Sequence, residues 1–279
     1  MKLNCCIFCF FFLFLSHHVS AQPYFDLTGI NYFKNIVSNN NIKANLEAIN
    51  GFINIPIRND SDYTIFSLGY DHLAIVVQTQ EKYSLSGYRF SVSRIHKWSS
   101  GWLSVFVFNA RSNSGLPEVF SSDNFQFGGA FVSTKKLSNR FKYSFGLYYN
   151  QEQFGPFFVP LAGINWSVTP DFRIFGLLPN NFYLDYRIIK PFHVGFNFSF
   201  VTSSFRLEQN QYFRYNENQI RLYLNWIVGA SHVLFMESGH SIGRKFTKGN
   251  VNSSSGSTLD YNFDQGWIIK MGYTYRIFD

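Results

Sequence analysis

Hydrophobic and polar residues alternate along most of this chain. Between residues 192 and 200, the apolar side chains Phe, Val, Phe, Phe and Phe occupy every second position, and His, Gly, Asn and Ser stand between them. The same alternation holds in residues 141–150, 220–229 and 267–277. A period of two places one set on each face of a strand, whereas a helix would mix both sets on every face. These segments therefore predict strands with an aromatic face and a polar face.

Turn signals divide the chain into about fourteen such strands. They are predicted at residues 24–36, 42–57, 62–75, 84–96, 102–112, 125–137, 140–150, 157–168, 171–178, 181–189, 192–206, 217–230, 232–243 and 265–277. An even number of strands that alternate apolar-out and polar-in is typical of bacterial outer-membrane barrels. The two short segments on either side of Leu178-Pro179 reduce the count to about twelve if they do not cross the membrane.

The connections between the predicted strands alternate in length. Alternate connections form two sets. One set is short throughout, and the other contains the long connections at residues 111–124, 207–216 and 244–264. Short turns lie on the periplasmic side of outer-membrane barrels and long loops lie outside. This alternation places both ends of the chain in the periplasm.

The alternation is less regular in the N-terminal third. In residues 42–57 the apolar phase changes near Asn50, which predicts a β-bulge. In residues 102–108, Leu103, Val105 and Val107 compete with the residues between them for the outward face. These segments predict either a plugged, partly apolar lumen or positions near the bilayer edges.

The first 21 residues have the three parts of a secretory signal peptide. A positive residue, Lys2, precedes the apolar run Cys5–Leu15, and Val19-Ser20-Ala21 gives a small-x-small cleavage site. The run is shorter than the roughly 20 apolar residues that a membrane-spanning helix needs, so a retained helix is the less favoured interpretation. We therefore expect a cleaved signal peptide at residues 1–21 and one outer-membrane β-barrel at residues 22–279. All three cysteines precede residue 22, so the mature chain has no thiol for a disulfide or a metal site.

Composition agrees with a barrel in lipid. Aromatic residues make up 20% of the chain, yet the mean hydropathy is only −0.08. In a barrel only every second residue meets lipid, which reconciles these two values. The formal net charge of +7 is scattered over strands and turns, so we expect no nucleic-acid binding. The excess charge fits contact with anionic lipid or a solvated surface equally well.

The polar faces of the predicted strands place seven charged or titratable residues in the lumen. They are Lys142, Asp185, Arg187, His193, Arg221, Lys270 and Arg276. Such residues either select the ions or solutes that pass, or pair with one another and hold the strands in register. Asp185 and Arg187 are two positions apart on one strand and share a face, which predicts an ion pair in the lumen.

Few residues suggest an enzyme. Ser238 and His240 share a strand face near a predicted loop, as a nucleophile and its base would. Barrel hydrolases that act on lipid favour the order His-x-Ser, which is reversed here, so we do not expect catalysis. The histidines are spread along the chain, and none has a second His and a carboxylate at ligand spacing on its strand, so we expect no metal and no cofactor.

An ordered set of motifs carries a family resemblance. The motifs are Phe125-Gln126-Phe127-Gly128-Gly129, Phe145-Gly146-Leu147-Tyr148-Tyr149-Asn150, Phe154-Gly155-Pro156-Phe157-Phe158-Val159-Pro160-Leu161-Ala162-Gly163 and Phe175-Gly176-Leu177-Leu178-Pro179. The chain resembles an outer-membrane β-barrel family of unknown function from Gram-negative bacteria. The resemblance implies a barrel in the bacterial outer membrane and no catalytic residues. Many such barrels end on an aromatic residue read by the assembly machinery, whereas here Phe278 is penultimate and Asp279 is last.

The sequence thus predicts an all-β, transmembrane, antiparallel up-and-down barrel. The favoured function is a passive channel or small-solute transporter. The alternatives are a structural or binding barrel without an open pore and, less favoured, a hydrolase acting on lipid. The expected partners are outer-membrane lipid, the barrel assembly machinery and an unidentified small solute.

Overall fold

The computed structural model describes residues 24–39, 42–77, 82–251 and 259–278. The signal peptide expected at residues 1–21 lies outside the described residues and remains a prediction. Within the described residues, no helix is both long enough and apolar enough to cross a membrane.

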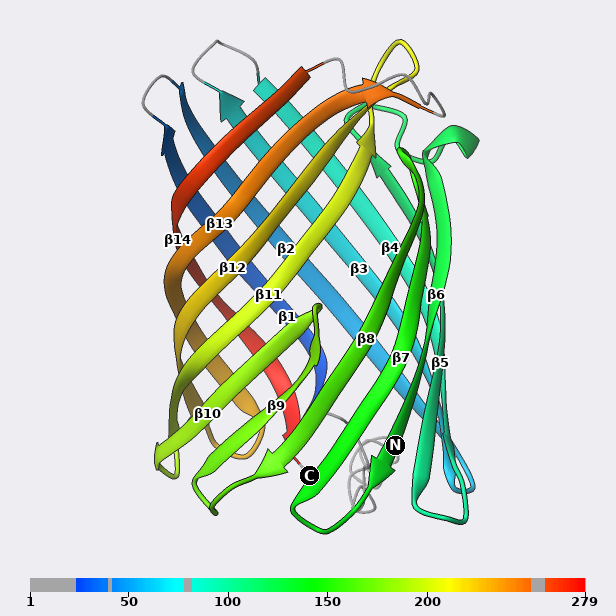
Figure 1. The fold of residues 1–279 in the computed structure, drawn as a ribbon, viewed down its shortest axis with the longest axis vertical. Coiled ribbons are helices and arrows are strands. Elements are labelled where there is room, and N and C mark those ends of the chain that lie inside the picture. Colours follow the sequence, from blue (N-terminus) through cyan, green and yellow to red (C-terminus); the bar gives the residue numbers. More distant parts are fainter. Residues whose placement is uncertain (1–23, 40–41, 78–81, 252–258, 279) are drawn as a thin grey trace, which may run out of the picture.

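The structure is a closed antiparallel barrel of fourteen strands (Figure 1). The strands are β1 (Tyr24–Asn39), β2 (Ile42–Asn59), β3 (Asp62–Val77), β4 (Lys82–Lys97), β5 (Trp102–Ser114), β6 (Phe125–Lys136), β7 (Phe141–Glu152), β8 (Gly155–Ser167), β9 (Phe172–Leu178), β10 (Asn181–Ile189), β11 (Phe192–Arg206), β12 (Gln211–Val228), β13 (His232–Asn250) and β14 (Leu259–Phe278). Pairing of β1 with β14, from Tyr24↔Phe278 to Val37↔Gly266, closes the barrel. The predicted fold class and the count of fourteen strands are confirmed.

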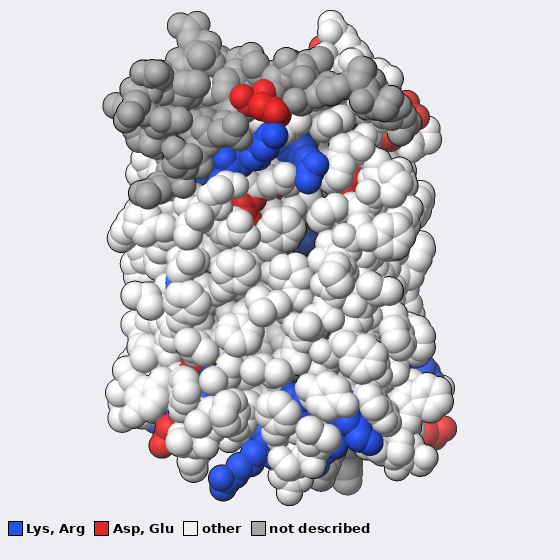
Figure 2. Space-filling view, in the orientation of Figure 1, with Lys and Arg blue, Asp and Glu red and all other residues white. Residues whose placement is uncertain are grey.

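The outer surface carries an apolar belt. Large side chains that alternate with inward polar ones are exposed on it, among them Leu68, Phe106, Leu147, Phe158 and Leu222. Figure 2 shows that the middle of the visible face is almost free of charged residues, which gather toward its two ends. An outward apolar band between charged rims is the surface of a barrel that spans a bilayer. We assign the end with the chain termini to the periplasm because the connections there are short.

Two strands are much shorter than the rest. β9 has 7 residues and β10 has 9, against 12 to 20 in the other twelve strands. Their hairpin occupies only the periplasmic part of the wall (Figure 1). Beyond it, residues 155–161 of β8 pair with β7 alone among the described residues, because the pairing with β9 covers only Ala162 to Ser167.

Above this hairpin, β11 leaves the wall and crosses to β5. Arg206 pairs in parallel with Ser114, and the Gly115 amide donates to the Arg206 carbonyl at 2.8 Å. Phe154, between β7 and β8, lies over the outward face of β12, with its ring 3.9 Å from the Arg214 guanidinium. At the extracellular end the lumen is therefore bounded by nine strands, β11 to β14 and β1 to β5, and the β7–β8 hairpin overlaps them from outside.

The narrow end is filled by a cluster of inward apolar side chains, which we call the plug. Its members are Phe33, Ala44, Leu46, Ala48, Leu73, Ile75, Val77, Leu85, Phe205, Phe213, Tyr215, Phe246 and Ile268. A barrel of about eight strands has an interior just wide enough for side chains to fill. A ring of nine strands is therefore expected to be filled by side chains, as the plug fills it here. Of the two interpretations of the irregular N-terminal alternation, the structure shows the partly apolar lumen.

The bulge predicted near Asn50 is wrong. β2 pairs with β1 and with β3 without any shift of register. The change of phase arises because Leu46 and Ala48 point into the plug, while Ile53 and Ile55 point toward lipid. Register shifts occur elsewhere, between Asn216 and Asn218 among other places.

Two of the three long loops are shorter than predicted. β12 begins at Gln211, opposite Asn250 at the end of β13, so the paired strands extend beyond the predicted boundaries. Likewise, β14 begins at Leu259, opposite Lys248. The polar residues that suggested loops continue the ladder of hydrogen bonds around the plug.

Candidate functional site: the barrel lumen

The structure places the seven candidate residues on the inward faces of their strands. Asp185, Arg187, His193 and Arg276 line a cavity at the periplasmic mouth, and Arg221 and Lys270 line a cavity at mid-barrel. Lys142 lies near the periplasmic end of β7, opposite Lys136 of β6.

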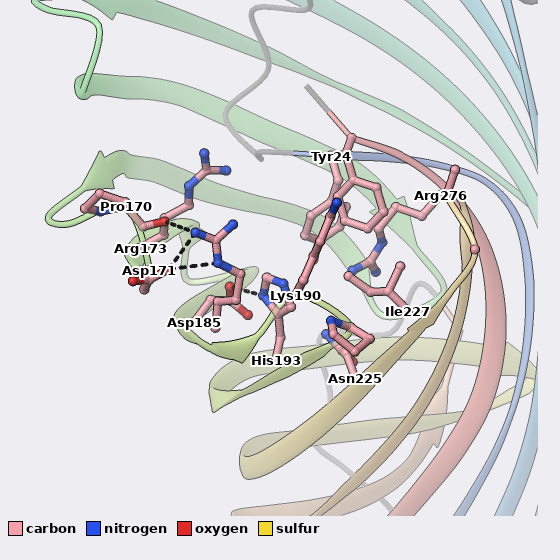
Figure 3. Close-up of a pocket in the computed structure, with 15 residues that line it drawn as sticks. Tyr24, Pro170, Asp171, Arg173, Asp185, Lys190, His193, Asn225, Ile227 and Arg276 are labelled. Atoms are coloured by element: carbon pink, nitrogen blue, oxygen red, sulfur yellow. Dashed lines mark hydrogen bonds and ion pairs between the residues drawn. The ribbon is translucent and has the colours of Figure 1, made fainter.

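The periplasmic mouth contains a cavity of about 590 Å³, which we call the vestibule. Figure 3 shows Arg173, Lys190 and Arg276 around it, together with two acidic residues. The basic side chains outnumber the acidic ones in this lining, so the mouth favours anions.

The predicted ion pair between Asp185 and Arg187 is wrong. Arg187 Nε donates to Asp171 Oδ1 at 2.8 Å, and Asp185 Oδ2 contacts His193 Nδ1 at 2.8 Å (Figure 3). Residues two apart on a strand are separated by roughly 6.6 Å along it, so a side chain on an adjacent strand or turn is nearer. Each group pairs with that neighbour.

A row of aromatic side chains crosses the lumen above the vestibule. Ring centroids are 5.8 Å apart between Tyr24 and Phe175, 5.0 Å between Phe175 and Tyr183, and 6.1 Å between Tyr183 and Tyr223. We call these four residues the aromatic bar. β1 and β9 lie far apart in the strand order, so the bar spans the interior between distant parts of the wall.

Polar contacts fix both ends of the bar. Arg276 donates to the two carboxylate oxygens of Asp26, at 2.6 and 3.1 Å, and its guanidinium lies 3.5 Å from the centre of the Tyr24 ring. At the other end, the Tyr223 hydroxyl donates to Asp185 Oδ1 at 2.7 Å. The bar is therefore an ordered barrier between the vestibule and the space above it.

Two adjoining cavities lie between the bar and the plug. They measure about 440 and 270 Å³ and share Asn31, Phe52 and Lys270 in their walls. We call the larger one the central chamber. Glu237 lines the smaller cavity and contacts two cations of the chamber wall, Arg221 at 2.5 Å and Lys270 at 3.6 Å.

A buried polar network joins the crossing end of β11 to β5, β6 and β7, and we call it the seam. Its centre is Ser204, whose hydroxyl donates to Glu152 Oε2 at 2.6 Å and accepts from the Gln153 amide at 2.9 Å. The Ser204 carbonyl accepts from Gln126 at 2.9 Å and from Asn113 at 3.1 Å. Buried polar groups are costly unless they are all bonded, so the seam specifies where β11 docks.

A buried ion pair lies beside the plug. Arg244 Nε donates to Glu217 Oε2 at 2.8 Å, and both side chains are fully buried. Tyr215 and Gln219 also donate to Glu217. This pair links β12 to β13 at the register shift, inside the narrow end of the barrel.

Comparison with known proteins identifies the family. A family model described as a domain of unknown function (DUF6268) matches residues 29–276. The chain belongs to the DUF6268 family. This agrees with the resemblance to an outer-membrane family of unknown function. A search of curated proteins found no match.

The fold of this DUF6268 barrel is supported by one solved structure. It is similar to the COG4313 outer membrane channel from Pseudomonas putida F1, with a TM-score of 0.52, 6% identity and coverage of 90% of this chain and 96% of that chain. It is also similar to the NanC porin, with a TM-score of 0.41, 8% identity and coverage of 89% and 100%. The closed antiparallel barrel with its apolar belt makes the DUF6268 chain an outer-membrane β-barrel embedded in lipid.

Ser238 and His240 of the DUF6268 barrel both face outward, halfway along β13. The His240 ring packs edge-on against Trp267, with centroids 4.6 Å apart. No hydrogen bond joins Ser238 to His240 in the described structure, and no third residue orients the imidazole there. Among the described residues, no group of three His, Cys, Asp or Glu side chains is arranged to hold a metal ion.

Sequence reasoning missed the seam and the plug of the DUF6268 barrel. Ser204, Gln126 and Glu152 fall on inward faces, so alternation marks them only as lumenal. Their association depends on the crossing of β11, which follows from the short β9–β10 hairpin. The one sequence signal for this arrangement is the shortness of that hairpin.

Proposed function

We propose that the barrel is a gated pathway for small solutes, closed at its extracellular end in this conformation. The observation that carries the proposal is the contrast along the lumen. Cavities with charged walls occupy the periplasmic and central parts, and the plug and the seam close the remaining part. A barrel of fourteen strands is wide enough for a water-filled lumen unless something fills it.

The geometry also supports a defined gate. β11 pairs with β10 only from Phe192 to Ser199. Its remaining residues pair with β12 and are hydrogen-bonded at the seam. If β11 returns to the wall beside β8, the seam opens and the nine-strand ring widens. The gate would then be the movement of one strand end, which leaves the rest of the barrel intact.

A reversible crosslink tests the gate. Residues 22–279 contain no cysteine, so Ser114→Cys with Arg206→Cys introduces a single pair at the seam. We expect channel openings in planar bilayers under reducing conditions, their loss on oxidation, and their return with a reductant. The matched control is Thr134→Cys with Ser144→Cys, a pair of permanent neighbours in the wall whose hydroxyls are 2.8 Å apart. Its oxidation should leave conductance unchanged.

The main alternative is a non-conducting structural or binding barrel. The completeness of the plug favours it, because its central side chains, such as Ile75, Leu85 and Phe246, have no exposed surface. Absence of openings in the reduced seam pair and in the native protein would support this alternative and refute the gated pathway.

A further inference from the structure

The central chamber is apolar at one end and charged at the other. On β2 the inward face changes from Leu46 to Asn50 toward the periplasm, and on β3 it changes from Leu73 to Asp71. The apolar residues are the lower surface of the plug. A molecule in this chamber therefore contacts the apolar side chains of the plug on its extracellular side and polar groups on its periplasmic side.

The charged part of the lining is predominantly cationic. Four cations face the chamber, Arg89, Arg111, Arg221 and Lys270, and Asp71 is the one carboxylate among the described lining residues. Arg111 is also paired with the buried Glu152, and Glu237 is paired with Arg221 and Lys270. The four cations therefore exceed the three carboxylates near them by one charge. The barrel wall and the plug enclose the chamber, so this excess attracts an anion more strongly than the same charge would on an open surface.

Two of these cations are only loosely paired. Lys270 Nζ lies 3.6 Å from Glu237, a carboxylate that also serves Arg221 at 2.5 Å. Arg89 lies 3.7 Å from Asp71, and 46% of its side chain is exposed within the barrel. Within the described part of the chain, Glu237 is the one carboxylate paired with Lys270 or Arg221, so this group carries one excess positive charge.

We propose that the central chamber binds a small amphipathic carboxylate. Its carboxylate group lies toward Lys270 and Arg221, and its apolar part lies against Phe33 and Leu46 below the plug. The volume of about 440 Å³ is in the range of small-molecule sites. This inference deepens the proposed function by naming a class of solute. It rests on that function only for the route by which the solute reaches the chamber.

Calorimetric titration of the native barrel in nanodiscs tests the site directly. The probe is 3-phenylpropionate, and its neutral amide, 3-phenylpropionamide, has the same size and apolar group. We expect the affinity for the amide to be lower by about tenfold or more, because the amide loses a charge-assisted contact. Phenyl phosphate serves as a third ligand, and stronger binding of this phosphate would replace the carboxylate with a phosphate as the natural class. Equal affinities for acid and amide would overturn the proposal.

A matched pair of variants locates the site. Lys270→Met should reduce the affinity for 3-phenylpropionate about tenfold and leave the affinity for the amide nearly unchanged. Lys136→Met, the same change at the periplasmic end of β6 and away from the chamber, should alter neither. An equal loss in both variants would show a general charge effect and refute the site. If Lys270→Met does not fold, the comparison of acid and amide on the native barrel still tests whether the barrel prefers a carboxylate.

The two proposals fail in different ways. Selective binding of the acid by a barrel that never conducts would leave the binding site standing and refute the gated pathway. Channel openings without any preference for the acid over the amide would refute the site alone.

Discussion

The same fourteen strands enclose two unlike regions of the lumen. Near the periplasm the interior holds charged cavities crossed by one row of aromatic rings. Near the extracellular end it is packed with apolar side chains around a buried ion pair. The number of strands around each region explains the difference, because nine strands leave room for side chains only and fourteen leave room for more.

The short β9–β10 hairpin produces this difference. Where it is present, β8 and β11 are held apart and the perimeter is complete. Where it ends, β11 turns inward and docks on the seam. One short hairpin therefore determines both the width and the chemistry of the lumen along its length.

The largest effect is expected at the buried ion pair of the narrow region. Arg244→Leu leaves the buried charge of Glu217 without its cation, with only the donors of Tyr215 and Gln219, which should lower the free energy of unfolding by about 3–5 kcal/mol. Urea unfolding in lipid bilayers, followed by tryptophan fluorescence, measures this loss. The double variant Glu217→Leu with Arg244→Leu should lose less than the single one. A double variant as unstable as Arg244→Leu would show that the pair itself stabilises the narrow end.

A smaller effect is expected at the aromatic bar of the wide region. Phe175→Ala should join the vestibule to the central chamber, because Phe175 connects Tyr24 to Tyr183. A cysteine introduced by Ser199→Cys in the chamber wall reports the change. We expect a membrane-impermeant thiol reagent on the periplasmic side to label it severalfold faster.

The control for the bar is Phe145→Ala, which removes a ring of the same kind from the outward face. It should leave the labelling rate unchanged. Equal labelling rates in native and Phe175→Ala barrels would mean that the bar does not limit access from the periplasm.

The smallest effect is expected for the ion pair at the mouth. Arg187 and Asp171 are 41% and 50% exposed, so Arg187→Leu should change the free energy of unfolding by less than about 1 kcal/mol. The same urea titration compares it with Arg244→Leu. Similar losses in the two variants would contradict the contrast between a hydrated and a buried region.

The sequence predicted the strands best where the two regions impose a simple rule. Residues 141–150 and 192–200 face lipid on one side and polar groups on the other, so alternation was sufficient. The rule failed in residues 42–57, because Leu46 enters the plug while Ile53 meets lipid. Alternation cannot distinguish two apolar environments.

The site was less predictable than the fold. Alternation assigns Lys270 and Arg221 to an inward face, but it does not show that both cations pair with Glu237 of the adjoining cavity. That association depends on register between β12, β13 and β14, and the seam depends on contacts between strands that are not neighbours in order. The expected Asp185–Arg187 pair shows the same limit, because cross-strand partners were nearer than the partner on the same strand.

The short hairpin has a further consequence for the neighbouring strand β8. Residues 155–161 form a stretch of sheet edge inside a transmembrane barrel. Such an edge offers backbone groups to which a strand of another chain can add. Pro156 and Pro160 lie in this stretch, and each lacks the amide hydrogen that an added strand would need. The two prolines thus leave this edge with fewer backbone donors for a strand of another chain.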